Sequence, residues 1–249
     1  MPRLSSPKIR IDRLLAERGL AKSRVEAQAL ILAGQILVNE QKVDKCGTLV
    51  ERSAEIRILG GKPPYASRAG RKLEAALDYF KIDPGGKICL DIGASTGGFT
   101  DCLLSRGAAK IYAVDAGTNQ MDWRVRQNPR VVALEKTNAR YLRFEQIGMK
   151  VDFVTMDVSF ISSTLILPVL PEILEPGAAA LILVKPQFEA SREKIGKGGV
   201  VRDPGVHQEA VQKVSRKLSE LNFEVQGSVE SALPGAEGNR EFFVYALWR

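Results

Sequence analysis

From residue 67 onward, short apolar segments alternate with stretches of helical character, and this alternation limits the possible folds more than any other feature of the chain. Five of the apolar segments read as strands, namely 87–91, 110–115, 131–134, 151–157 and 178–185. Strands separated by helices form βαβ units, which predict a mostly parallel sheet. Two more strand-like segments, 223–229 and 241–247, follow a predicted helix over 206–221. We therefore expect an α/β domain over residues 67–249 whose seven-stranded sheet ends in a hairpin-like pair.

The first 59 residues follow a different pattern, with two helices and then a small sheet. Ile11, Leu14 and Leu15 share one face of the first helix, and Gly19 ends it. Short strand-like segments follow at 36–38, 41–43 and 55–59. This pattern predicts a small α+β domain over residues 9–59.

The second helix of this domain begins at S-R-V-E, which reads as a capping box. In a capping box, the Ser23 hydroxyl and the Glu26 carboxylate would each satisfy a free backbone amide at the helix start. Val25, Ala29 and Leu32 recur at helical spacing before Gly34 ends the helix. We expect these three apolar side chains to face the core.

The two parts of the chain differ in charge, and a Gly- and Pro-rich segment over 60–66 predicts a linker between them. Residues 1–72 contain 15 Lys and Arg against 7 Asp and Glu, whereas the remaining residues contain 21 against 22. A basic module beside a near-neutral one indicates a polyanionic partner, and nucleic acid is favoured over a membrane because no amphipathic anchor is evident. The alternative is a charge asymmetry that only aids solubility.

A glycine-rich segment, D-I-G-A-S-T-G-G-F-T-D, joins the strand at 87–91 to a predicted helix. Glycines in such a turn allow close backbone approach to a ligand, and the helix start offers free amides. The segment matches neither G-x-G-x-x-G nor the G-K-[ST] of a P-loop, which disfavours dinucleotide binding and ATP or GTP hydrolysis. Asp115 ends the next strand, where an acidic group often binds ribose hydroxyls. A tight strand–helix turn without a ligand is the alternative.

Four charged residues stand near predicted element ends. Asp157 and Lys185 end apolar strands, and Lys72 and Glu241 lie nearer element starts. A merely solvated charge is unusual at the end of a buried strand, and open α/β sheets bind ligands at the carboxyl ends of their strands. Each residue alone is compatible with a structural ion pair, but together they form a candidate catalytic set.

The N-terminal segments R-I-D-R-L-L-A-E-R-G-L-A-K-S-R and A-G-Q-I-L-V-N resemble the small RNA-binding domain named after ribosomal protein S4, over residues 9–59. The resemblance implies that basic side chains contact RNA phosphates. The residues implied are Arg10, Arg13, Lys22, Arg24, Lys42 and Lys45. Such contacts position a protein on RNA without reading its sequence. For each residue the alternative is a solvated surface charge.

The segments D-I-G-A-S-T-G-G-F and Y-A-V-D resemble the S-adenosylmethionine site of class I methyltransferases, whose sheet is Rossmann-like. The resemblance assigns four residues to the methionine part of the cofactor: Asp91, Gly93, Ser95 and Gly97. It places Asp115 on the ribose, and Thr137 and Asn138 near the adenine. This cofactor carries a positive sulfur and no phosphate, which suits an acidic residue at the loop.

The set Lys72, Asp157, Lys185 and Glu241 resembles the Lys-Asp-Lys-Glu tetrad of FtsJ-type ribose 2′-O-methyltransferases. From about residue 9 to its end, the chain is similar to the TlyA, or haemolysin A, family. The segments that carry this similarity include S-R-A-G-R-K-L, M-D-V-S-F, V-K-P-Q-F-E and E-G-N-R-E-F-F. The resemblance implies methyl transfer to ribose 2′-hydroxyls of ribosomal RNA, with cytidine as the nucleotide. The RNA substrate is either free or part of a ribosomal subunit.

Lys185 is the implied group that takes the hydroxyl proton or stabilises the oxygen. Crowding by Lys72 would favour its neutral form, whereas Asp157 and Glu241 would favour the ammonium, so the sequence leaves both open.

Other classes of function find less support in the sequence. The longest apolar run, 178–184, is too short to cross a bilayer and the N-terminus lacks an apolar signal core, so we expect a cytoplasmic protein without a membrane partner. Three cysteines without C-x-x-C spacing favour neither disulfides nor a metal site. His207 at a predicted helix start reads as a capping or surface residue. The alternatives are an RNA-binding module without turnover, a membrane-active haemolysin and a nucleotide-dependent oxidoreductase; no oligomeric state is specified.

Overall fold

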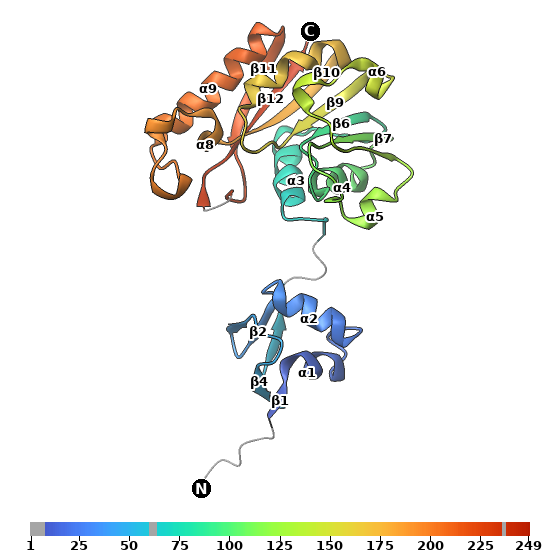
Figure 1. Ribbon diagram of the computed structural model, residues 1–249, viewed down its shortest axis with the longest axis vertical. Helices are drawn as coiled ribbons and strands as arrows, with labels where there is room; N and C mark the ends of the chain where they lie inside the picture. Colours follow the sequence, from blue (N-terminus) through green and yellow to red (C-terminus); the bar gives the residue numbers. More distant parts are fainter. Residues whose placement is uncertain (1–7, 60–63, 236–237) are drawn as a thin grey trace. The chain divides into compact units, whose positions relative to one another are not determined.

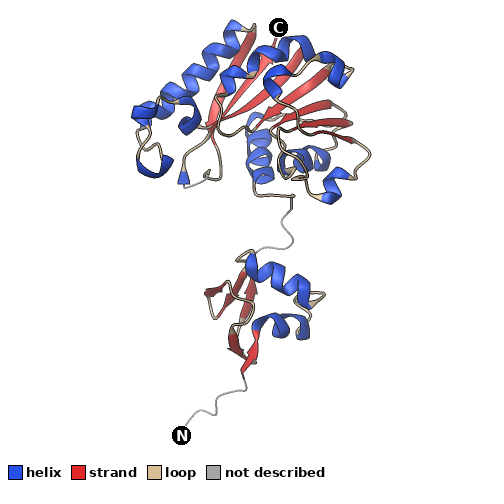
Figure 2. Cartoon of the chain, viewed as in Figure 1, coloured by secondary structure: helices blue, strands red, loops and turns tan. Residues whose placement is uncertain are grey.

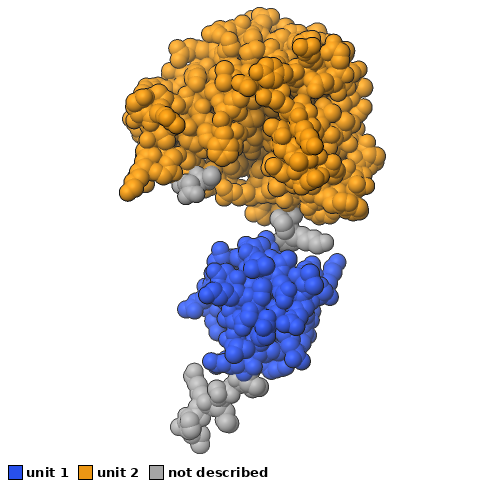
Figure 3. Space-filling model, in the orientation of Figure 1, with its two compact units in different colours: residues 1–63 blue, residues 64–249 orange. Residues whose placement is uncertain are grey.

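The computed structural model describes residues 8–59, 64–235 and 238–249. Within it the chain forms two compact units, residues 1–63 and 64–249, which Figure 3 distinguishes by colour. Of the expected linker, residues 60–63 lie outside the described residues. Tyr65, also expected there, is instead buried in the second unit, and its hydroxyl donates to Glu74 at 2.7 Å. The second unit therefore begins before residue 67.

Over residues 8–59, the described part of the first unit, the chain forms two short helices and five short strands. The helices are α1 (Ile11–Glu17) and α2 (Arg24–Leu32), and the strands are β1 (Lys8–Arg10), β2 (Ile36–Val38), β3 (Gln41–Val43), β4 (Leu49–Glu51) and β5 (Ile56–Ile58). β2 pairs with β3 and β5, and all three pairings in this unit are antiparallel, including β1 with β4. Strands β1 and β4 were not predicted from the sequence; each buries a single residue, Ile9 or Val50, between two exposed ones.

Helix α1 buries Ile11, Leu14 and Leu15, as predicted. Helix α2 does not bury the predicted face: Val25 and Leu32 are 76% and 72% exposed, and Ala27 and Ile31 are buried instead. Both sets have helical spacing, so periodicity alone does not choose between them.

The capping box at the start of α2 is only half correct. The Ser23 hydroxyl accepts from the Glu26 amide at 3.2 Å, whereas the Glu26 carboxylate accepts from the Lys22 amide rather than from Ser23.

The second unit is built on the expected seven-stranded sheet (Figures 1 and 2). Its strands are β6 (Ile88–Ile92), β7 (Lys110–Val114), β8 (Val131–Leu134), β9 (Val151–Met156), β10 (Leu174–Val184), β11 (Phe223–Glu230) and β12 (Phe242–Trp248). The order is β11-β12-β10-β9-β6-β7-β8. The five strands from β10 to β8 are parallel, and β12 runs antiparallel to both of its neighbours.

Helices cover both faces of this sheet, each over its own apolar core. One face is covered by α3 (Ala69–Phe80), α4 (Gly98–Ser105) and α5 (Trp123–Arg126). The other is covered by α6 (Phe144–Ile147), α7 (Leu170–Ile173) and α9 (Pro204–Glu220). Because parallel strands covered on both sides are buried, their sequences are continuous apolar runs. The expected α/β domain with a seven-stranded sheet, and the small α+β unit before it, are therefore confirmed.

The burial pattern of α2 leads to a direct test. Ile31→Ala should destabilise the first unit by about 2–4 kcal/mol, because it leaves a cavity in the core. Leu32→Ala, its matched control, should change stability by less than about 0.5 kcal/mol. Hydrogen exchange of peptides from residues 8–59, followed by mass spectrometry, measures both. A greater loss of protection in Leu32→Ala than in Ile31→Ala would mean that α2 buries the face first predicted.

Candidate active site

The loop between β6 and α4 lies against the loop that follows β9. Gly93 adopts φ +84°, and a Cβ built there would lie 2.3 Å from the backbone oxygen of Asp157. Only glycine fits this close approach without moving the backbone. Because Gly93 has no side chain, the loop after β6 and the loop after β9 can approach each other this closely.

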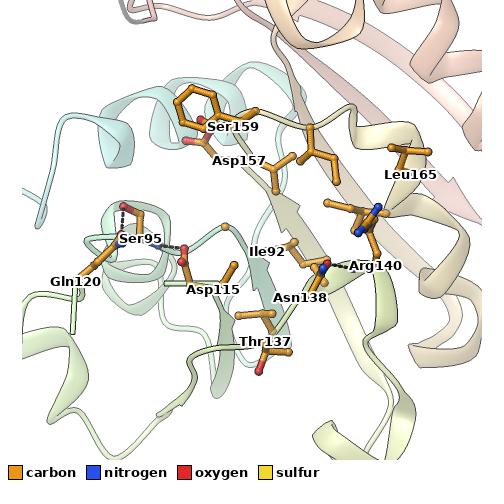
Figure 4. A pocket seen from close by; sticks show the side chains of 18 residues that line it. Ile92, Ser95, Asp115, Gln120, Thr137, Asn138, Arg140, Asp157, Ser159 and Leu165 are labelled. Carbon is orange, nitrogen blue, oxygen red and sulfur yellow. Dashed lines mark hydrogen bonds between the residues drawn. The ribbon is translucent and has the colours of Figure 1, made fainter. Parts of the chain in front are cut away.

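Asp115, just beyond the end of β7, organises the glycine-rich loop. One carboxylate oxygen accepts from the Ser95 amide at 2.8 Å, and the other accepts from the Gly117 amide at 2.7 Å. The Ser95 hydroxyl in turn contacts Gln120 at 3.2 Å (Figure 4). The carboxylate is therefore fixed beside the glycine-rich loop.

A cavity of about 710 Å³ opens at this edge of the sheet. Its lining includes five of the seven residues expected at the cofactor: Gly93, Ser95, Asp115, Thr137 and Asn138. Apolar side chains from Ile92, Val114 and Ile166 complete much of its wall, and Figure 4 shows Asp115, Thr137 and Asn138 around the same space. A concave site with a few polar groups on an apolar wall suits a nucleoside-sized ligand.

The structure places Asp91 and Gly97 behind this lining. Asp91 is fully buried, and its carboxylate accepts from the Thr100 hydroxyl at 2.6 Å and the Thr155 hydroxyl at 3.0 Å. Gly97 caps α4 with φ +87°, so it shapes the turn. Successive side chains of a strand point to opposite faces of the sheet, and that of Asp91 points toward α4. Asp91 is therefore buried between β6 and α4.

Lys185 and Asp157 meet as an ion pair at the carboxyl edge. The Lys185 Nζ lies 2.6 Å from Asp157 Oδ1 and donates to the Ser159 hydroxyl at 2.9 Å. All three residues line a second cavity of about 180 Å³, and Asp157 and Ser159 also line the larger one. The pair therefore stands where the two cavities adjoin.

Lys72 and Glu241 form the other half of the expected set, as a buried ion pair at 2.6 Å. The four charges thus form two pairs, each with a lysine and a carboxylate. Glu241 is confined by Gly235, where a Cβ would lie 2.0 Å from the carboxylate. The sequence suggested the four residues together but not their pairing, which joins positions far apart in the chain.

Two neighbours of Asp157 were not expected to have a role. Ser159 accepts from Lys185, and Phe160 is 92% exposed with φ +65°, which is unusual for a bulky residue. The centroids of the Phe160 and Phe188 rings lie 5.3 Å apart, and Phe160 lines the larger cavity. The segment M-D-V-S-F contains both residues, but exposure and φ are invisible in a sequence. Such strain is typical of functional loops.

The basic residues of the first unit are held in different ways. Arg10 and Arg24 both contact the buried Asp12 at 3.0 Å, and hydrogen bonding from Arg10 holds the pKa of Asp12 well below its usual range. Arg13 pairs with Glu17 at 2.8 Å. Three other expected side chains, Lys22, Lys42 and Lys45, are exposed. The structure therefore presents two oriented arginines and three exposed lysines.

His207 differs from its expected surface position. It is buried near the start of α9, where Asp203 caps the helix, and its Nε2 lies 2.9 Å from the backbone oxygen of Val201. Its ring packs against Phe242 at 5.6 Å. His207 therefore packs between strand β12 and the loop that precedes α9.

Among the described residues, no group of three or more His, Cys, Asp or Glu is arranged to hold a metal ion. Over the same ranges, no helix is both long and apolar enough to span a bilayer.

The parallel sheet, the glycine turn and the charged strand ends define a methyltransferase of the Rossmann-like class. The FtsJ-like methyltransferase family matches residues 65–247, and the S4 domain matches residues 9–56. A solved methyltransferase structure from Aquifex aeolicus shares the fold, with a TM-score of 0.50 and 21% identity, over 74% of this chain and 95% of its own.

Two curated relatives extend over nearly the whole chain. The "16S/23S rRNA (cytidine-2'-O)-methyltransferase TlyA" of Mycobacterium tuberculosis is 44% identical, with 95% of this chain and 88% of the relative covered. "Hemolysin A" of Brachyspira hyodysenteriae is 40% identical, with 96% of this chain and all of the relative covered. The chain belongs to the TlyA, or haemolysin A, family of FtsJ-like methyltransferases that carry an S4 domain.

The buried Asp91 leads to a pH-dependent prediction. Burial raises its pKa to about 6, against the hydrogen bonds from Thr100 and Thr155 that lower it. A carboxyl whose pKa is higher in the folded than in the unfolded state lowers the free energy of unfolding as pH rises from about 4 to 6. Above about pH 6 this loss of stability stays constant. Asp91→Asn should therefore raise Tm by a few degrees above pH 6, since 1 kcal/mol corresponds to roughly 2–4 °C at this size.

Thermal unfolding of both proteins between pH 4 and 8 measures this difference, which should shrink toward pH 4. A lower Tm for Asp91→Asn at pH 7 would show that the ionised carboxylate stabilises the fold.

Proposed function

We propose that this protein transfers a methyl group from S-adenosylmethionine to a ribose 2′-hydroxyl of ribosomal RNA, at a cytidine. The observation that carries the proposal is the Lys185–Asp157 pair at the junction of the two cavities. One cavity is large enough for a nucleoside cofactor, and the other offers a place for the reacting hydroxyl. Ribosomal RNA and cytidine enter through the name of the mycobacterial relative.

The larger cavity suits S-adenosylmethionine in size and in charge. We assign Asp115 to the ribose hydroxyls, Thr137 and Asn138 to the adenine side, and Gly93 and Ser95 to the methionine part. Asp115 and Asp157 give the cavity acidic groups that favour a cation. Asp91 and Gly97 support this site from behind by shaping the loop. When bound, the cofactor supplies an electrophilic methyl group.

Lys185 acts on the ribose hydroxyl. As an ammonium it pairs with Asp157 and donates one N–H to Ser159. A remaining N–H would stabilise the oxygen as its proton leaves; as a neutral amine, Lys185 would instead take that proton. Lys72 and Glu241 are proposed to complete the catalytic set as a buried pair. Most of the acceleration comes from positioning, and proton handling adds a smaller factor.

The first unit, residues 9–59, supplies the RNA contacts in this proposal. Arg10 and Arg24 are oriented by Asp12, and Lys22, Lys42, Lys45 and Arg13 add positive charge nearby in sequence. Phe160 is exposed and follows Ser159, the partner of Lys185, so its ring offers a face on which an RNA base can stack. Residues 67–249 would then bind cofactor and perform the transfer.

Lys185→Ala should reduce single-turnover methyl transfer to ribosomal RNA by roughly 10²–10⁴-fold, as expected for a group that handles the proton. Cofactor affinity and the circular dichroism spectrum should stay unchanged. We expect Lys185→Arg to fail as well, because a guanidinium is no base and has another shape. Mass spectrometry of digested RNA locates the methylated ribose.

Near-normal transfer by Lys185→Ala would remove this residue from the catalytic set. Binding of cofactor and RNA by the wild-type protein without any transfer would favour the RNA-binding module without turnover.

Lys22→Gln combined with Lys45→Gln should weaken binding to ribosomal RNA and lower the salt dependence, since each lost phosphate contact reduces the slope by roughly 0.7–0.9. Arg57→Gln is the matched control in the same unit, because Arg57 is already paired with Glu40 at 2.5 Å. Titrations at several salt concentrations measure both variants. Identical slopes for the double variant and the wild type would place the RNA contacts elsewhere.

A further inference from the structure

Glu189 holds a buried carboxylate that the proposed reaction does not use. It ends the short helix α8 (Pro186–Glu189), and its side chain is only 2% exposed. One oxygen accepts from both the amide and the hydroxyl of Ser163 at 2.7 Å, and the other accepts from the Ser162 hydroxyl at 2.5 Å. Lys213 of α9 approaches the second oxygen at 3.1 Å and donates to the Glu189 backbone oxygen at 2.9 Å.

These contacts join the same two segments that carry the Lys185–Asp157 pair. The segment after β9 contains Asp157 and Ser159, and it continues to Ser162 and Ser163. The segment after β10 begins at Lys185 and reaches Glu189 four residues later. A charged side chain therefore joins the two segments twice: Lys185 contacts Asp157 where both segments begin, and Glu189 contacts Ser162 and Ser163 further along.

An aromatic contact lies between these two connections. Phe160, from the first segment, and Phe188, from the second, have ring centroids 5.3 Å apart. Phe160 also holds a positive φ, a conformation that persists only where the surroundings enforce it. The Glu189 contacts to Ser162 and Ser163 follow directly after it in the chain, so they are suited to enforce it.

We propose that Glu189 is a positioning residue: it fixes the segment after β9 against the segment after β10, and so sets the contact of Lys185 with Asp157 and Ser159. The inference rests on the proposed function for its catalytic meaning. A carboxylate suits this place because every group around it is a donor and a carboxylate only accepts. Burying a charge costs free energy that packing alone would not require.

The test compares Glu189→Gln with Lys213→Met. Glutamine keeps the shape but directs an NH₂ group at serine donors, which loosens the connection between the segments. Lys213→Met removes the tie to α9 and leaves the serine contacts in place, so it controls for general loss of stability. Ser162→Ala combined with Ser163→Ala provides a second, milder way to weaken the same connection should Glu189→Gln fold poorly.

Two measurements report on position. The first is the rate at which an amine-reactive reagent labels Lys185, followed by peptide mass spectrometry, because a Lys185 freed from Asp157 should react at least several-fold faster. The second is single-turnover methyl transfer at saturating cofactor and RNA. We expect Glu189→Gln to lower that rate at least tenfold with both affinities unchanged, and Lys213→Met to stay within about twofold of wild type in both measurements.

Unchanged labelling of Lys185 in Glu189→Gln and in the double serine variant would overturn the proposal. So would equal effects of Glu189→Gln and Lys213→Met, since these would indicate a general structural role. A wild-type protein that transfers no methyl group, while labelling responds as expected, would refute the proposed function and leave the positioning role standing.

Discussion

The parallel pairing of β7, β6, β9 and β10 is the constraint on which the rest of the site depends. It brings four carboxyl ends to one edge of the sheet, so that Gly93, Asp115, Asp157 and Lys185, each just beyond a strand, become neighbours. Their separation in sequence is large, but the spacing between adjacent strands is only about 4.8 Å. The missing side chain at Gly93 then lets two of the loops touch.

Charge pairing stabilises this edge once the sheet has formed it. Lys72 and Glu241 are buried together, so loss of either partner would leave an uncompensated charge, at a cost of about 3–5 kcal/mol. The pair ties α3, near the start of the second unit, to the segment before its last strand. Lys185 and Asp157 are less enclosed: both line the smaller cavity, and Asp157 also lines the larger one. The two pairs thus have the same chemistry in different surroundings, one buried and the other beside the cavities.

Sequence reasoning succeeded where a residue's position follows from its place on a strand. The continuous apolar runs located five parallel strands, and three of the residues that end them, Asp115, Asp157 and Lys185, line the cavities. It failed where two arrangements satisfy one pattern. Val25 and Leu32 have the same helical spacing as a buried face, yet α2 buries Ala27 and Ile31. The choice depends on where α1 and the small sheets lie, and that is a property of packing.

The sequence by itself determined the order of the strands in the second unit, the glycine turn and the charged strand ends, because these depend on local periodicity and on the backbone freedom of glycine. Only the tertiary structure decided which charges pair, that Asp91 faces inward and that His207 is buried, since each depends on contacts between distant segments. Glu189 is the clearest case. Nothing in V-K-P-Q-F-E announces a partner, and its meaning comes from Ser162 and Ser163, more than 25 residues earlier, which the sheet brings to it.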